Sequence, residues 1–402
     1  MRVLQINQNY NFGSTGRIMK EINDSIVNSG NEGYMLAAYA NGNDEHLYVM
    51  EALPIDWAVR KNLVINRVTG LTGYKAKRRT RNALKWIDSI KPDIIHLHNI
   101  HGDWIHLETL FDYIKKNTIP LVWTLHDCWS FTGRCSYFDN LQCFKWLDKC
   151  EKCPDLTVYP KSYFFDFSKK MYKDKKDWFT GLNNPTIVTP SKWLANYVRQ
   201  SYLGNYNVQV INNGIDLSQF ERKQTRSKYI GDDKRRVVLG VAASWTPRKG
   251  LEDIIKLKSL LNPAQYVLVV VGLNSKQFDS LPKGIIGVKR TKNVAELAEL
   301  YSQASVFINP TYQDNYPTVN LESIACGTPV ITYETGGSVE SVSPDTGLVV
   351  KKGDINAMAE AIIKVCESGV DYSEKCITYG QCHFGKNDRY QEYLSLYEKI
   401  NR

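Results

Sequence analysis

The stretch TYQDNYPTVNLESIACGTPVI, residues 311–331, places two carboxylates across the start of a helix, with seven residues between them. Pro317 suits the first helical position and apolar residues follow it, so the pattern predicts a helix that begins near Tyr316 or Pro317. Asp314 would then lie just before the helix, and Glu322 more than one turn inside it.

This helix start is a candidate phosphate site. The backbone N–H groups of Thr318 and Val319 would point outward, where the aligned peptide dipoles amount to about half a positive charge. A carboxylate on each side can accept hydrogen bonds from sugar hydroxyls, so the arrangement suits a sugar attached to a diphosphate. The alternative is that Asp314 only caps the helix and that Glu322 is a solvated side chain.

The segment resembles the acid-x7-acid motif of retaining glycosyltransferases of family 4, including the ACGTPVI that follows at 325–331. This resemblance implies that Asp314 contacts the donor sugar and that Glu322 binds the ribose of the nucleotide. It also implies donor-binding positions at Asn315, Tyr316, Pro317 and Thr318. The family usually has Glu in the first place, and Asp is one methylene shorter, so the first contact has less reach here.

Two neighbouring cations give a second sign of a diphosphate site. Arg248 and Lys249 stand at a strand-loop-helix junction in VLGVAASWTPRKGLEDIIKL, residues 238–257. There they would neutralise the charge that develops on the leaving group when the sugar–phosphate bond breaks. Surface cations without a ligand are the alternative. The family commonly has Arg five residues before this Lys, where this chain has Ser244, so either Arg248 replaces that guanidinium or fewer charges hold the diphosphate.

Two features of the first half stand at strand ends. Gly13 and Gly16 lie between a strand and a helix, where glycine permits close backbone approach to a phosphate, although a tight turn needs glycine too. His126 and Asp127 follow the strand at 121–125, at the end of the sheet where ligands collect. A histidine there is often structural, but the matching His of family 4 contacts the donor sugar. We therefore expect His126, Asp314, Arg248 and Lys249 to be catalytic and Gly13 and Gly16 to bind the donor.

HLHNIHGDW, residues 96–104, holds three more histidines and invites a metal interpretation. Alternation puts His96 and His98 on one face of a strand, so packing and hydrogen bonding are their expected roles.

The chain alternates apolar strands with helices in both halves, which indicates parallel sheets covered on both faces. The resemblance implies the GT-B fold, an α/β architecture of two Rossmann-like, doubly wound domains facing a cleft. We expect an acceptor-binding domain at 1–216, a polar linker at 217–236, a nucleotide-sugar-binding domain at 237–383, and a C-terminal helix at 384–402 that crosses back to the first domain.

Length and composition are typical of a soluble two-domain protein. The 402 residues are 43% hydrophobic and 23% charged, and no segment approaches the roughly 20 apolar residues of a membrane span. The N-terminal run lacks the long apolar core of a signal peptide, so we expect a cytoplasmic protein.

The formal net charge of +9 is concentrated in two segments. KAKRRTR, residues 75–81, holds five cations, and SYFFDFSKKMYKDKKDW, residues 162–178, interleaves five Lys with six aromatics. Lys mixed with aromatics is typical of a membrane-surface segment, and a solvated basic helix is the alternative. We expect peripheral attachment to the anionic inner face of the plasma membrane, and no nucleic-acid partner.

Nine cysteines in a cytosolic chain favour reduced thiols. Cys135, Cys143, Cys150 and Cys153 read C-x7-C-x6-C-x2-C, in which the closing pair lets two thiolates reach one tetrahedral metal. This spacing predicts a structural zinc ion, with scattered free thiols as the alternative.

The combined interpretation is a retaining glycosyltransferase that needs no cofactor for catalysis. It would move a sugar from a UDP- or GDP-sugar to a glycan or a polyprenyl-diphosphate-linked acceptor, in the assembly of cell-surface polysaccharide. A GT-B epimerase or phosphorylase is one alternative, and a catalytically silent GT-B subunit that binds a partner is another.

Overall fold

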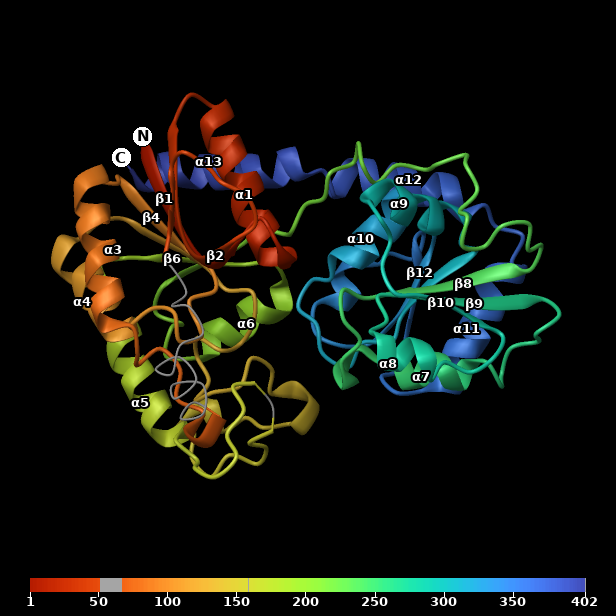
Figure 1. Cartoon of the computed structure of the whole chain (residues 1–402), viewed down its shortest axis with the longest axis horizontal. Helices are drawn as coiled ribbons and strands as arrows, with labels where there is room; N and C mark the ends of the chain where they lie inside the picture. Colours follow the sequence, from red (N-terminus) through yellow and green to blue (C-terminus); the bar gives the residue numbers. More distant parts are fainter. Residues whose placement is uncertain (51–66, 158, 402) are drawn as a thin grey trace. The chain divides into compact units, whose positions relative to one another are not determined.

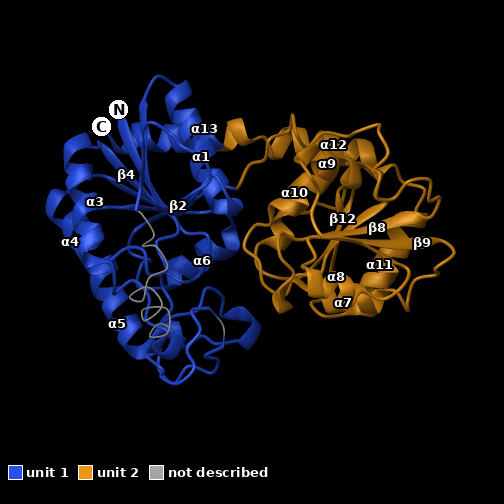
Figure 2. Ribbon diagram, in the orientation of Figure 1, with its two compact units in different colours: residues 1–212, 390–402 blue, residues 213–389 orange. Residues whose placement is uncertain are grey.

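The computed structural model describes residues 1–50, 67–157 and 159–401 (Figure 1). The chain divides into two compact units, coloured separately in Figure 2. Unit 1 comprises residues 1–212 and 390–402, and unit 2 comprises residues 213–389. Each unit is built on one parallel sheet.

In its described residues, unit 1 has a seven-stranded sheet in the order β3-β2-β1-β4-β5-β6-β7. The strands are β1 (Arg2–Tyr10), β2 (Glu32–Ala40), β3 (Leu47–Val49), β4 (Ile94–Leu97), β5 (Leu121–Thr124), β6 (Thr186–Thr189) and β7 (Asn207–Val210). The strand order reverses between β1 and β4, and ligands of doubly wound sheets bind at the carboxyl end of such a reversal.

Helices cover both faces of this sheet. They are α1 (Gly13–Asn28), α3 (Lys77–Ile90), α4 (Leu107–Asn117), α5 (Ser168–Phe179), α6 (Lys192–Gln200) and α13 (Lys386–Ile400). Val3 of β1 packs with α1 and with the tyrosines of α13, whereas its neighbour Leu4 packs in the cluster that contains α3 and α4. Figure 1 shows α3 and α4 on the side of the sheet opposite α1 and α13. Successive side chains of a strand point to opposite faces, which explains this division.

In its described residues, unit 2 has a six-stranded sheet in the order β10-β9-β8-β11-β12-β13. Its strands are β8 (Arg236–Val241), β9 (Tyr266–Val271), β10 (Ile285–Val288), β11 (Val306–Asn309), β12 (Val330–Tyr333) and β13 (Gly347–Val350). Its helices are α7 (Leu251–Leu257), α8 (Ser275–Asp279), α9 (Val294–Gln303), α10 (Thr318–Ala325), α11 (Ile355–Glu367) and α12 (Tyr372–His383). Residues of α9, α10 and α12 pack in one cluster, and residues of α7 and α11 pack in another. The two parallel α/β sheets confirm the predicted fold class.

The division of the chain differs from the predicted one. Residues 217–236, predicted as a linker, belong to unit 2, and Phe220 and Ile230 are buried in its core. Backbone N–H groups of this segment also donate to side chains at the end of α9, Lys223 to Ser302 and Ser227 to Gln303, both at 2.9 Å. The first unit ends at residue 212 instead of 216, and its C-terminal part starts at residue 390 instead of 384.

Gly13 and Gly16, predicted to lie between a strand and a helix, are instead the first and fourth residues of α1. β1 continues to Tyr10 and α1 begins at Gly13, so only Asn11 and Phe12 separate them. Over the described ranges, no helix combines the length and the apolar character that crossing a membrane needs.

Candidate functional site

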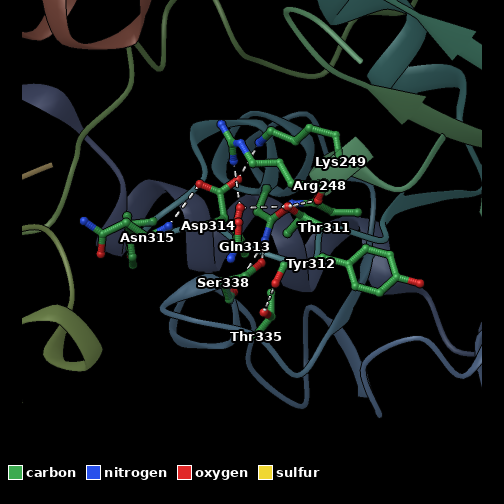
Figure 3. A network of polar contacts seen from close by, with 12 residues as sticks. Arg248, Lys249, Thr311, Tyr312, Gln313, Asp314, Asn315, Thr335 and Ser338 are labelled. Carbon is green, nitrogen blue, oxygen red and sulfur yellow. Dashed lines mark hydrogen bonds and ion pairs between the residues drawn. The ribbon is translucent and has the colours of Figure 1, made fainter. Parts of the chain in front are cut away.

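The loop that follows β11 carries Asp314 and is tied to the turn that follows β8 (Figure 3). The Arg248 guanidinium donates to the carbonyl of Gln313 at 2.7 Å, and the N–H of Tyr312 donates to the carbonyl of Arg248 at 2.7 Å. Two segments about 65 residues apart in sequence are thereby held together in both directions. The structure thus brings together the two segments that carry the predicted catalytic residues Arg248, Lys249 and Asp314.

Lys249 and Asp314 form an ion pair. Lys249 Nζ lies 2.5 Å from Asp314 Oδ2, and the two side chains are only 20% and 14% exposed. The other carboxylate oxygen, Oδ1, accepts from the N–H of Asn315 at 3.0 Å. Attraction between partly buried charges exceeds that of a surface pair, so this contact fixes the loop. A diphosphate that approaches Lys249 would therefore share it with Asp314.

Two glycines allow the chain to approach itself closely here. Gly250 has φ +77°, and a Cβ on it would stand 2.1 Å from the carbonyl oxygen of Pro310. Gly336 has φ +51°, and a Cβ there would stand 1.9 Å from the carbonyl oxygen of Asp314. Any other residue at either position would clash with backbone and strain its own conformation, so the Asp314 loop keeps its place only with glycine at both.

Helix α10 begins at Thr318 with Pro317 as its N-cap, one residue beyond the later of the two predicted starts. Glu322 lies inside this helix and is buried, with an exposed fraction of 6%. Its Oε2 accepts from the hydroxyl of Tyr301 at 3.1 Å. The interpretation of Glu322 as a solvated side chain is therefore wrong.

Two of the predicted donor-binding residues between Asp314 and Glu322 have buried side chains. Asn315 and Tyr316 are buried, and the Tyr316 ring packs in the core of unit 2. Burial raises the pKa of the Tyr316 hydroxyl. The carbonyl of Tyr316 accepts from the Asn213 side chain at 3.1 Å. Tyr316 thus anchors the start of α10, and a ligand contact by its ring would need the core to open.

Sequence reasoning missed Asp253, which supports the same loop. This carboxylate is 3% exposed and accepts from the hydroxyls of Tyr312 at 2.7 Å and Tyr333 at 2.8 Å. It links the Asp314 loop to α7 and β12. Its partners lie 59 and 80 residues away, so no local spacing marks it.

In unit 1, Gly13 and Gly16 lie in the first turn of α1, just after the end of β1. Gly13 has φ +66°, and a Cβ on Gly16 would lie 3.0 Å from the carbonyl oxygen of Asn9. The tight turn alone accounts for both glycines. Their role under a donor diphosphate stays a prediction.

His126 follows β5 and lies beside a buried histidine. Its Nε2 is 3.2 Å from Nδ1 of His98, whose Nε2 is 3.0 Å from Oε1 of Gln5 in β1. His96 meets the hydroxyls of Thr124 at 2.8 Å and Tyr397 at 2.6 Å. Hydrogen bonding is thus the role of His96 and His98, as expected.

Asp127, the neighbour of His126, contacts a different histidine. Its Oδ2 is 3.4 Å from His101 Nε2, and its Oδ1 accepts from the N–H of Trp129 at 2.8 Å. Burial alone would raise the pKa of Asp127, but His101 and the Trp129 N–H outweigh burial and hold the pKa below its usual value. Asp127 is therefore a carboxylate at neutral pH.

Two of the four cysteines predicted to bind zinc form other hydrogen bonds in the structure. Within the described ranges, no three Cys, His, Asp or Glu side chains are grouped so that they could hold a metal ion. Cys150 Sγ instead accepts from the N–H of Gly133 at 3.1 Å, and Cys153 Sγ donates to the carbonyl of Asp155 at 3.3 Å. Burial raises the pKa of Cys135 to about 11 and that of Cys150 to about 12, which favours thiols. For Cys135, Cys143, Cys150 and Cys153, zinc stays a prediction that elemental analysis of the purified protein tests.

Comparisons with known proteins place the chain in a class. Residues 58–219 match the family described as Glycosyltransferase Family 4, and residues 221–383 match the family described as Glycosyl transferases group 1. Together these segments cover most of the chain. It therefore belongs to the glycosyltransferases that combine a family 4 domain with a group 1 domain.

Two curated relatives are similar over part of their length. WcaC of Escherichia coli, named as a candidate colanic acid biosynthesis glycosyl transferase, is 25% identical over 281 residues, which are 66% of this chain and 65% of WcaC. An N,N'-diacetylbacillosaminyl-diphospho-undecaprenol alpha-1,3-N-acetylgalactosaminyltransferase of Campylobacter jejuni is 24% identical over 222 residues, or 51% of this chain and 58% of that protein. The chain thus spans less than two thirds of either relative.

Solved structures share the fold over the whole chain. Sucrose-phosphate synthase from Thermosynechococcus elongatus has a TM-score of 0.74 at 18% identity, covering 99% of this chain and 98% of that one. HepE from Anabaena, solved in complex with UDP-glucose, has a TM-score of 0.64 at 14% identity and covers 98% of this chain and 99% of HepE. These likenesses show the GT-B fold.

Proposed function

We propose that the chain is a retaining glycosyltransferase that takes its sugar from a nucleotide-diphosphate donor and acts in the assembly of cell-surface polysaccharide. The observation that carries this proposal is the Lys249–Asp314 ion pair, held on a fixed loop eight residues before a buried Glu322. A cation suits the diphosphate of a nucleotide sugar, and two carboxylates can accept hydrogen bonds from its sugar and ribose hydroxyls. The UDP-glucose bound by HepE, a neighbour in fold, supports this donor class.

In the proposed reaction the bond between the sugar carbon and the diphosphate oxygen breaks. The acceptor oxygen attacks from the same face, and its proton passes to the departing diphosphate. Lys249, Arg248 and the N-terminus of α10 stabilise the negative charge that grows on that diphosphate. Asp314 holds the sugar hydroxyls, and Glu322 holds the ribose. These protein cations carry the charge, so we expect turnover to be insensitive to a divalent-metal chelator.

We also expect His126 to contact the donor sugar and Gly13 and Gly16 to bind the donor. These roles come from the family resemblance. The names of WcaC and of the Campylobacter jejuni enzyme support an acceptor that is a growing glycan or a polyprenyl-diphosphate-linked sugar.

A panel of UDP-, GDP- and ADP-sugars tests the proposal without knowledge of the acceptor. We expect slow hydrolysis of one donor, seen as release of the nucleoside diphosphate. An epimerase would instead yield a second nucleotide sugar, and a silent subunit would leave the whole panel intact. Either outcome would refute the proposed reaction.

We also propose that the protein works at the cytoplasmic face of an anionic membrane, which it contacts through unit 1. Tyr163, Phe164 and Phe165 are 61%, 75% and 54% exposed. Segment 162–178 contacts the residue just before segment 75–81, because the hydroxyl of Tyr74 donates to Asp174 at 2.7 Å and Lys170 stands over the Tyr74 ring. Part of segment 162–178 is nevertheless core, since Met171, Tyr172 and Lys175 of α5 are buried.

Co-sedimentation with anionic vesicles at low and high salt tests this attachment. Each Lys or Arg near the surface contributes about 1 kcal/mol, so binding should weaken as salt screens the charges. Changing Phe164 and Phe165 to Ser should reduce binding several-fold, whereas Phe278→Ser, which changes an exposed phenylalanine of unit 2, should not. Equal binding to neutral and anionic vesicles would contradict the proposal.

A further inference from the structure

A continuous series of hydrogen bonds runs from the backbone of α1, through the buried side chains of Gln5 and His98, to the half-buried His126. The Gln5 amide nitrogen donates to the carbonyl of Met19 at 3.0 Å. Gln5 Oε1 lies 3.0 Å from His98 Nε2, and His98 Nδ1 lies 3.2 Å from His126 Nε2. Gln5 is fully buried and His98 is 1% exposed, so solvent does not compete for the contact between these two side chains.

The direction of each hydrogen bond follows from the Met19 carbonyl, at which the series begins. A backbone carbonyl only accepts, so the Met19 carbonyl requires the amide nitrogen of Gln5 and turns Oε1 toward His98. An amide oxygen also only accepts, so His98 Nε2 must carry the hydrogen. A neutral imidazole has a single N–H, which leaves His98 Nδ1 as an acceptor. The hydrogen between the two rings therefore belongs to His126 Nε2.

Both rings are neutral at physiological pH. Burial lowers the pKa of His98 well below its usual value, and the neighbouring His96 and His126 act in the same direction. Burial also lowers the pKa of His126 to about 4. The charge of Asp127 acts to raise this pKa, and His101 acts to lower it. Each ring therefore gains a second proton only below the pH range in which the protein is expected to work.

We propose that Gln5 and His98 are positioning residues that hold His126 as the neutral tautomer with its hydrogen on Nε2. The opposite ring nitrogen, Nδ1, is then an acceptor. One consequence rests on the proposed function: the sugar group that His126 recognises must be a hydroxyl that donates its hydrogen to Nδ1. A His126 ring free to exchange tautomers would spend part of its time presenting an N–H to that hydroxyl.

Nitrogen NMR of the 15N-histidine-labelled full chain, without donor, reads the tautomer directly. His126→Gln identifies the resonances by their loss from the spectrum. In the unmodified protein we expect the hydrogen of His126 on Nε2. Finding it on Nδ1 would overturn the inference, whatever the donor panel shows, because this measurement involves no reaction.

Variants separate positioning from structural damage. His98→Asn still offers an acceptor oxygen and should keep the tautomer, whereas His98→Leu offers none and should give a mixture of tautomers. Tyr397→Phe removes only the neighbouring bond to His96 and should change nothing at His126. If His98→Leu does not fold, Gln5→Met is the replacement, because it removes the hydrogen bond between residue 5 and His98.

For donor hydrolysis we expect His98→Leu to lower kcat about 10- to 100-fold with a smaller change in KM, and His98→Asn to restore most of it. If His126 has the same single tautomer in the unmodified protein and in a folded His98→Leu or Gln5→Met variant, the hydrogen bonds of Gln5 and His98 do not set that tautomer. This result would overturn the inference.

Discussion

Lys249→Ala is expected to lower kcat/KM for the donor by about 100- to 1000-fold, with most of the loss in kcat. The ammonium group is needed more as the diphosphate leaves than when it is bound, so its removal affects the transition state more than the ground state. The structure adds a second cost, because the change leaves the partly buried Asp314 without its cation. Steady-state kinetics of donor hydrolysis, at several donor concentrations, gives both constants.

A double-mutant cycle separates the two effects. Asp314→Asn and Lys249→Ala should not be additive, because each removes the same ion pair. Lys364→Ala removes an exposed cation of the same unit, on α11, and should leave the kinetics unchanged. Wild-type turnover in Lys249→Ala would remove this residue from the mechanism.

Glu322→Ala is expected to raise the donor KM about 10- to 100-fold with little change in kcat. Hydrogen bonds to a charged group contribute about 1.5–3 kcal/mol, and the ribose contact is the same in the ground state and the transition state. The variant therefore loses affinity in both states equally.

Tyr301→Phe is the matched control for Glu322. It removes the internal hydrogen bond at 3.1 Å but keeps the carboxylate that would bind the ribose. We expect a small loss of thermal stability and a donor KM near that of the unmodified protein. If both variants raise the KM equally, the effect of Glu322 lies in the packing of α10 and not in ribose binding.

The repeating part of the fold was predictable from the sequence because it depends on local patterns. Apolar runs such as LVWTL and YVLVVV mark buried parallel strands, and both became strands of the expected sheets. The helix after Pro317 was found from one proline and the apolar residues that follow. Such signals need only a few neighbouring positions.

The boundary between the units was not predictable in the same way. Residues 217–236 are polar and lack periodicity, yet Phe220 and Ile230 bury themselves against unit 2. A few apolar residues scattered through a polar stretch give no pattern, and the burial of Phe220 and Ile230 depends on a cluster that includes residues of α9, far along the chain. The tyrosines of α13, at 390, 393 and 397, do recur at helical spacing, and this signal could have located the part of α13 that packs in unit 1.

The site was predicted as a set of residues but not as a set of contacts. Lys249 and Asp314 were each assigned to a ligand, and the structure pairs them with each other. Asp253, Gln5 and His98 support the predicted groups through contacts that span between 28 and 93 residues. Such pairs arise from the order of strands in the sheet, which residue types and spacing do not reveal.

The configuration of the released sugar tests the central claim most directly. The donor that the panel identifies is incubated with the protein, and proton NMR follows the anomeric signal of the sugar as it first appears. The proposed mechanism predicts a sugar that initially has the same anomeric configuration as the donor, formed together with the nucleoside diphosphate and strongly slowed in Lys249→Ala. An inverted sugar, or a release that Lys249→Ala leaves unchanged, would contradict the account.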